Sequence, residues 1–98
     1  LKKYNNNNDF VVNLLQMFFA GIPEYIKALE IAISKNDISA ISFNSHTIKG
    51  MAKGMGFLIL AEFAIEIEQN TQLTIQERLI IYNKIINELE FLKNEYYS

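Results

Sequence analysis

The chain of 98 residues contains no cysteine, which excludes disulfide bonds, thiolate catalysis and the usual structural zinc sites. It also lacks any apolar run of the roughly 18 residues that a membrane-spanning helix needs. Both absences suit a cytoplasmic protein, and we expect a domain that makes no membrane contact.

The chain also has little net charge and no cluster of basic residues. The formal net charge is −2, and the nine basic residues are scattered among the eleven acidic ones rather than gathered in a stripe. Because nucleic-acid binding depends on concentrated positive charge, this distribution argues against nucleic acid as the main partner. Strands are not indicated either, since no segment alternates polar and apolar residues for long enough.

Hydrophobic residues are abundant: they make up half of the chain, enough for a proper core in a single domain. Residues 1–8 contain the polar tract Asn5 to Asn8 and are expected to be a frayed lead-in, whereas residues 9–98 are expected to fold. The chain begins with Leu1 rather than methionine, so we expect it to be a piece of a longer protein.

A long first helix is predicted to start at Phe10, with Asp9 as its N-cap. Its apolar positions recur at spacings of three and four, which is helical periodicity: Val11, Leu14, Leu15, Phe18, Ile22, Ile26, Leu29 and Ile33. Pro23 falls inside this pattern, and a proline in a helix interior costs about 3 kcal/mol. Because the hydrophobic phase continues across Pro23, one long helix kinked there is favoured over two short helices broken near Gly21.

A second helix is predicted to follow Asn36, with Asp37 as its cap. Its inward stripe has the spacing of a heptad seam: Ile38, Ile41, Ser45, Ile48, Ala52 and Met55. Gly54 and Gly56 then supply the backbone freedom that a tight turn between two helices requires.

Two further helices complete the pattern. The third is predicted from near Phe57 to near Gln69, with Leu60, Ala64 and Ile67 facing inward. After a connection over residues 70–73, Thr74 caps the last helix. The inward stripe of this helix is Ile75, Leu79, Tyr82, Ile86, Leu89, Leu92 and Tyr96. Four amphipathic helices joined by short turns predict an all-α fold, an antiparallel four-helix bundle.

The only histidine of the chain, His46, lies in the predicted second helix. At about 100° of rotation per residue, it sits roughly 130° around the helix from the apolar stripe, so we expect it on an exposed face. Its neighbours on that face are small, basic or aromatic: Ser39, Ser42, Phe43, Lys49, Gly50 and Lys53. A lone histidine is more often a surface residue without a function, and only these neighbours favour a chemical role.

Lys49 and Gly50 indicate which chemistry to expect. A neutral imidazole is a good nucleophile near neutral pH, and its attack on a phosphoryl group gives a labile phosphoramidate. Lys49, one helical turn from His46, can place a cation beside the transferring oxygens. A glycine inside a helix costs about 1 kcal/mol relative to alanine. One explanation of Gly50 is that the missing side chain lets another protein approach the His46 ring. The other is that the glycine allows two helices of this domain to pack closely.

These residues resemble the pattern of histidine-containing phosphotransfer (HPt) domains. The matching features are Ser45 before His46, the pair Lys49-Gly50, Gly56 in a small-residue turn, and Ile67-Glu68 closing a helix. Three residues depart from the smaller ones common in this stretch: Met51, Lys53 and Met55. The specific match covers residues 45–68, and the resemblance extends from about residue 9 to residue 97.

The resemblance implies a phosphorelay intermediate, which accepts a phosphoryl group from a receiver-domain aspartate and passes it to another receiver aspartate. Carried onto this chain, His46 is the phosphoacceptor, Lys49 steadies the phosphoryl group and Gly50 leaves room for the receiver. Glu68 corresponds to the residue that can hold the other imidazole nitrogen, although taken alone it would be a solvated helix end.

Three residues beside His46 are expected to contact the receiver: Ser42, Phe43 and Lys53. Phe43 suits an interface, but it could equally pack against the long first helix. Lys53 either adds to the attraction of phosphate or only solubilises the helix end. The expected partners are receiver domains of response regulators or hybrid kinases, and the domain itself is expected to be a monomer.

Three other interpretations stay open. A kinase-coupled phosphoacceptor domain of a chemotaxis-type histidine kinase shares the lysine-glycine pair, so only the domain order of the full chain would separate it. The dimerisation hairpin of ordinary histidine kinases is disfavoured, because Thr47 follows His46 where an acidic residue is normal. A helical adaptor that is not phosphorylated is the third, and the presence of both His46 and Lys49 weighs against it.

An autonomous enzyme is the least supported interpretation. No second histidine or carboxylate pair accompanies His46, and the chain has no glycine-rich nucleotide loop, so no cofactor and no ATP are expected. No metal is expected in this domain, because the cations near His46 would repel magnesium, which the receiver would hold instead.

Overall fold

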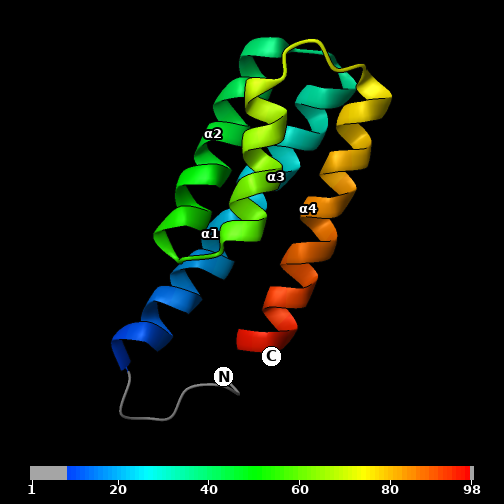
Figure 1. The fold of residues 1–98 in the computed structure, drawn as a ribbon. Helices are drawn as coiled ribbons and strands as arrows, with labels where there is room; N and C mark the ends of the chain where they lie inside the picture. The colour runs from blue at the N-terminus through cyan, green and yellow to red at the C-terminus, as the bar shows by residue number, and fades with distance from the viewer. Residues whose placement is uncertain (1–8, 98) are drawn as a thin grey trace.

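The computed structural model describes residues 9–97, which form four α-helices and no strand. The helices are α1 (Asp9–Ser34), α2 (Ile38–Gly54), α3 (Leu58–Gln69) and α4 (Ile75–Tyr96). They run alternately up and down and are joined by short connections, as Figure 1 shows. The prediction of an all-α antiparallel bundle is confirmed. The lead-in expected at residues 1–8 lies outside the described residues.

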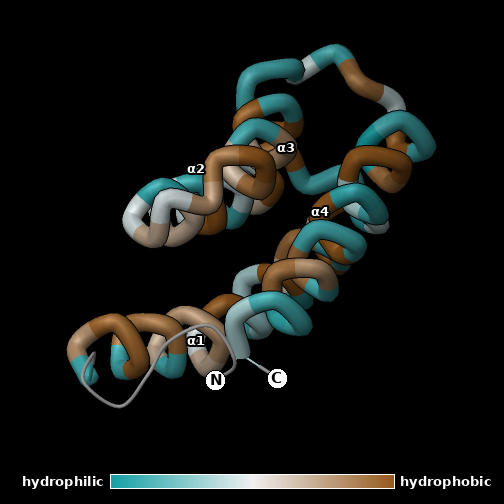
Figure 2. Tube along the Cα trace, turned by 60° about the horizontal axis from the view of Figure 1, so that its bottom comes forward, coloured by the Kyte–Doolittle hydropathy of each residue, from teal (hydrophilic) through white to brown (hydrophobic). Residues whose placement is uncertain are grey.

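Each helix packs against two others, in a closed ring. The contacts join α1 to α2, α2 to α3, α3 to α4, and α4 back to α1. The α1–α4 side of the bundle therefore lies opposite the α2–α3 side. Hydrophobic and hydrophilic stretches alternate along the helices in Figure 2, as amphipathic helices that share one core require.

α1 runs through Pro23 as one helix of 26 residues, which confirms the long helix and excludes two short ones. Proline has no backbone N–H, so the carbonyl of Phe19 lacks its usual helical partner at this point. The kink expected at Pro23 stays a prediction. Asp9, expected as the N-cap, instead belongs to the first turn of α1.

Side-chain caps fix the starts of α2 and α4, as predicted. The Asp37 carboxylate accepts a hydrogen bond from the Ala40 N–H at 3.2 Å. Thr74 and Glu77 form a capping box: the Glu77 N–H donates to Thr74 Oγ1 at 3.1 Å, and the Thr74 N–H donates to Glu77 Oε1 at 2.8 Å. These hydrogen bonds lower the pKa of Glu77. A cap of this kind stabilises a helix by about 1 kcal/mol.

Two turn residues adopt the left-handed backbone. Asn36 has φ of 52° between α1 and α2, and Gly56 has φ of 75° between α2 and α3. Asparagine and glycine are the residues that tolerate this region best. The prediction for Gly56 is thus confirmed, whereas Gly54 is the last residue of α2 and keeps an ordinary φ.

The core contains most of the expected stripes of α1, α2 and α3, but Ile38 is exposed, and Val11, Leu14 and Met55 are only partly buried. Ile38 remains 44% exposed because it is the first residue of α2, where the neighbouring helix has already ended. The buried hydrophobic residues of these three helices are Leu15, Phe18, Ile22, Ile26, Leu29, Ala32, Ile33, Ile41, Ile48, Ala52, Leu60, Ala61, Ala64 and Ile67.

The stripe predicted for α4 is correct at Tyr82 and Leu92 and misplaced elsewhere on the helix. Its most buried residues are Arg78, Ile81, Tyr82, Ile85 and Leu92. The expected core positions Ile75, Leu79, Ile86, Leu89 and Tyr96 are only partly buried. The rotation of α4 is set by its contacts with both α1 and α3, which the local pattern does not contain.

Arg78 is a buried charge that the sequence pattern did not reveal. Its side chain is 2% exposed and reaches both turns at one end of the bundle. Nη1 donates to Asn36 Oδ1 at 3.0 Å, and Nη2 donates to the Thr71 carbonyl at 3.2 Å. Arg78 therefore joins the α1–α2 turn to the α3–α4 connection.

Aromatic rings close the other end of the bundle. Phe18 meets Phe19 and Phe57 edge to face, with centroids 5.0 and 5.2 Å apart. Tyr97 stacks on Phe19 at 5.1 Å, and Tyr96 lies 5.8 Å from Phe57. These contacts tie the end of α4 to α1 and to the α2–α3 turn, each ring pair adding about 0.5–1.5 kcal/mol.

Candidate functional site

His46 projects from the outer face of α2. Its side chain is 65% exposed, while its neighbours Ser45 and Ile48 are completely buried. The Ser45 hydroxyl donates to the Ile41 carbonyl at 2.6 Å, which satisfies this polar group inside the core. The placement of His46 off the core matches the expectation from helical rotation.

Glu68 of α3 binds both His46 and Lys49. His46 Nδ1 lies 2.7 Å from Glu68 Oε2, and Lys49 Nζ donates to Glu68 Oε1 at 2.9 Å. His46 and Lys49 lie one turn apart on α2, and the antiparallel pairing of α2 with α3 brings the end of α3 beside them. The three side chains form one cluster, the His46–Lys49–Glu68 triad.

The triad is only partly open to solvent. The side chains of Lys49 and Glu68 are 19% and 18% exposed, so the ion pair lies beneath the more exposed imidazole. The hydrogen bond from Lys49 lowers the pKa of Glu68 most strongly, His46 lowers it further, and burial opposes both. Glu68 is therefore a carboxylate near neutral pH.

The charge of Glu68 decides which imidazole nitrogen carries the proton. An ionised carboxylate only accepts hydrogen bonds, so Nδ1 of a neutral His46 must be the donor. The lone pair then lies on Nε2, which has no hydrogen-bond partner among residues 9–97. A ring held in this way can act as a nucleophile or an acceptor through Nε2.

Space is open beside His46. A Cβ built on Gly50 would meet no atom within 4 Å, so close packing inside this chain does not explain the glycine. Phe43 is 65% exposed, which excludes the alternative that it is buried against α1. Ser42 and Lys53 are exposed as well. The face around His46 thus offers one ring, a gap and two polar groups.

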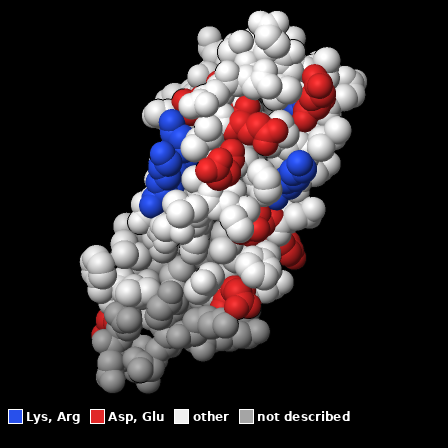
Figure 3. Space-filling model, in the orientation of Figure 1, with Lys and Arg blue, Asp and Glu red and all other residues white. Residues whose placement is uncertain are grey.

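The charges on this side are mixed. The lysines of α2 are Lys49 and Lys53, and three glutamates belong to α3: Glu62, Glu66 and Glu68. Figure 3 shows basic groups over α2 next to acidic groups over α3. Across residues 9–97 no group of three or more His, Cys, Asp or Glu side chains could hold a metal ion.

The fold and the site describe a helical bundle that presents one histidine beside a lysine and a carboxylate. The model of the Hpt domain family matches residues 13–95, and the chain belongs to this family. Hpt domains are phosphocarriers that interact with receiver domains in two-component signalling. Searches of curated proteins and of solved structures gave no match. None of the described helices is both long and apolar enough to span a bilayer.

Proposed function

We propose that the chain is a phosphorelay intermediate in which His46 accepts a phosphoryl group from a receiver-domain aspartate and passes it to another receiver aspartate. The observation that carries this proposal is the shared carboxylate: Glu68 binds Nδ1 of His46 and the ammonium of Lys49 beneath an exposed ring. We further propose that the domain works as a monomer in the cytoplasm.

The chemical step uses the lone pair of Nε2. This nitrogen attacks the phosphorus atom, the N–P bond forms, and the bond to the aspartyl oxygen breaks, so the aspartate leaves as a carboxylate with the bonding electrons. The imidazole keeps its Nδ1 proton and becomes positively charged. Glu68, 2.7 Å away, stabilises this charge because it is already ionised.

Lys49 acts on the phosphoryl oxygens. Phosphoryl transfer requires positioning and charge stabilisation more than covalent help from the protein. The ammonium of Lys49 is anchored at 2.9 Å from Glu68, one turn from His46, so it can turn toward the phosphoryl group without leaving the site. Any magnesium required belongs to the receiver.

The receiver would dock on the face around His46. Gly50 leaves the approach to the ring open, and Phe43 offers an exposed apolar contact at one turn from the histidine. Ser42 and Lys53 complete this face with a hydroxyl and a cation. A small, mixed surface suits a transient encounter better than a permanent complex.

Incubation with a phosphorylated receiver tests the proposal. The chain should gain an acid-labile phosphate, and His46→Gln should gain none while keeping the circular dichroism spectrum of the parent. Equal labelling of parent and His46→Gln would contradict the assignment. Labelling only when ATP and a kinase catalytic domain replace the receiver would instead indicate a kinase-coupled phosphoacceptor.

A further inference from the structure

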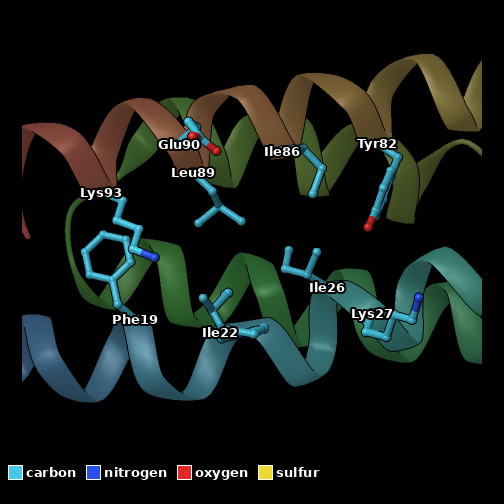
Figure 4. A pocket seen from close by; sticks show the side chains of 10 residues that line it. Phe19, Ile22, Ile26, Lys27, Tyr82, Ile86, Leu89, Glu90 and Lys93 are labelled. Atoms are coloured by element: carbon cyan, nitrogen blue, oxygen red, sulfur yellow. The ribbon is translucent and has the colours of Figure 1, made fainter. Parts of the chain in front are cut away.

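A groove runs between α1 and α4, on the opposite side of the bundle from the triad. Its volume is about 270 Å³. The apolar residues that line it are Phe19, Ile22, Ile26, Tyr82, Ile86 and Leu89. Figure 4 shows these side chains projecting toward one another from the two helices, which leave a gap between them. Pro23 of α1 also borders the groove.

One end of the groove carries the ammonium of Lys93. In Figure 4 the Lys93 side chain extends from α4 into the gap above Phe19. Among residues 9–97, Lys93 Nζ forms neither an ion pair nor a side-chain hydrogen bond. The other lysine of the groove, Lys27, is bound to Glu30 at 3.1 Å.

The other end of the groove is marked by a hydroxyl. Tyr82 is 7% exposed, and Figure 4 shows its oxygen directed into the gap near Ile26. Burial raises the pKa of Tyr82, so the phenol stays neutral over the physiological range. Between Lys93 and Tyr82 the lining is apolar except for Glu90 of α4, which forms no ion pair with Lys93 among residues 9–97.

The size of the groove limits the size of the ligand that it can hold. One turn of an α-helix with its side chains is about 10–12 Å across and about 5.4 Å long, so it occupies roughly 400–600 Å³. This exceeds the groove volume of about 270 Å³. Sites for drug-sized ligands start at about 300 Å³, so a smaller molecule is expected. From Phe19 to Ile26 the floor is about 10 Å long, at 1.5 Å per helical residue. A straight medium-length hydrocarbon chain fits these dimensions.

The positive charge of Lys93 indicates which head group the ligand should carry. A cation held over apolar surface gains most from an anion that completes its hydrogen bonds. We propose that the α1–α4 groove binds a medium-chain carboxylic acid, whose carboxylate pairs with Lys93 and whose chain lies between Ile22, Ile26, Ile86 and Leu89 toward Tyr82.

Such a ligand would not cover His46, because the α1–α4 side lies opposite the α2–α3 side. It would bridge the two helices and add apolar contact where the side chains leave a gap. Binding to the folded state alone stabilises that state by mass action. The proposal therefore concerns a second site that does not depend on phosphotransfer.

Titration of the ¹⁵N-labelled chain with decanoate, followed by NMR, tests the proposal. Amide shifts should change for the residues that line the groove, and 1-decanol, with the same chain and no charge, should bind more weakly. Lys93→Gln should weaken decanoate binding by about tenfold or more, the worth of one charge-assisted hydrogen bond, without changing decanol binding. Lys84→Gln, the same change elsewhere on α4, should leave both affinities unchanged.

Three results would overturn the proposal. The first is equal decanoate affinity in the parent and Lys93→Gln. The second is a set of shifts centred on exposed apolar residues elsewhere, such as Phe43 or Leu58, which would indicate non-specific association. The third is a dimer in sedimentation velocity that Ile86→Phe abolishes, because the groove would then belong to a second copy. If Ile86→Phe remains folded and monomeric and loses decanoate binding, the groove assignment is supported.

Discussion

Lys49 on the α2–α3 side of this bundle and Lys93 on the α1–α4 side are placed in opposite ways. On the α2–α3 side, Lys49 is bound to Glu68 at 2.9 Å and the same carboxylate orients His46. On the α1–α4 side, Lys93 projects over an apolar groove without a partner among the described residues. Each side consists of two packed antiparallel helices, but their charged side chains are arranged differently. The contacts with Glu68 hold Lys49 beside His46, whereas the ammonium of Lys93 would pair with the proposed ligand.

Removal of the Glu68 carboxylate should have the largest effect on the rate of phosphotransfer. Glu68→Ala removes the acceptor of the Nδ1 hydrogen bond and frees Lys49. A hydrogen bond to a charged group is worth about 1.5–3 kcal/mol, so transfer from a phosphorylated receiver should slow by about 10- to 100-fold. Rapid-quench measurement of the transfer rate checks this. Glu66→Ala, an exposed position on α3, is the matched control, and equal rates for the two variants would remove Glu68 from the mechanism.

A bulky side chain beside His46 should have the next largest effect on the rate of phosphotransfer. Gly50→Leu should slow transfer roughly tenfold or more, because a displaced partner loses the alignment that transfer needs. The fold should survive, since a Cβ at Gly50 meets no atom within 4 Å. Gly54→Leu makes the same change farther from His46 and should slow transfer less. If Gly50→Leu transfers as fast as the parent, the glycine does not provide clearance.

The two lysines should differ in their contribution to stability. Lys49→Gln breaks the ion pair with Glu68 and should lower the free energy of unfolding by about 1 kcal/mol. Lys93→Gln breaks no ion pair among residues 9–97 and should change the free energy of unfolding by less than about 0.5 kcal/mol. Urea denaturation of both variants measures the difference. A larger loss for Lys93→Gln than for Lys49→Gln would show that the Lys49–Glu68 ion pair does not stabilise the fold.

The smallest expected effect is on the free energy of unfolding at acidic pH. The pKa of Glu68 is lowered in the folded state, so its stabilisation is complete above the unfolded value of 4.5 and is lost as the pH falls through the lowered pKa. The parent should therefore lose more stability than Glu68→Gln over this acidic range, by less than about 1 kcal/mol. The lowered pKa of Glu77 is common to both proteins and cancels. Parallel pH profiles of the two proteins would contradict the ionised contact.

Local features of the sequence predicted the helices well. The caps at Asp37 and Thr74, the turn at Gly56 and the helical spacing of the apolar residues each depend on a few neighbouring positions. The rotation of α4 could not be predicted in this way. Its apolar residues occur on several faces, so the choice of Ile81 and Ile85 for the core depends on where α1 and α3 lie.

The site was predictable only in part. The exposed position of His46 and its closeness to Lys49 follow from spacing on one helix. The contact of Glu68 with both depends on how α2 and α3 align over an interval of 22 residues, and only the family resemblance pointed to it. Arg78 gave no sequence signal of burial, because its partners Asn36 and Thr71 lie in turns that meet only in the folded chain.

The role of Glu68 determines which nitrogen of His46 carries the phosphoryl group. The chain can be labelled with ¹⁵N-histidine, phosphorylated by a receiver and studied by NMR with ¹⁵N–³¹P coupling. Because Glu68 holds the proton on Nδ1, the phosphorus should couple directly to Nε2 of His46, with Nδ1 still protonated. A phosphoryl group on Nδ1, or none on His46, would contradict the account.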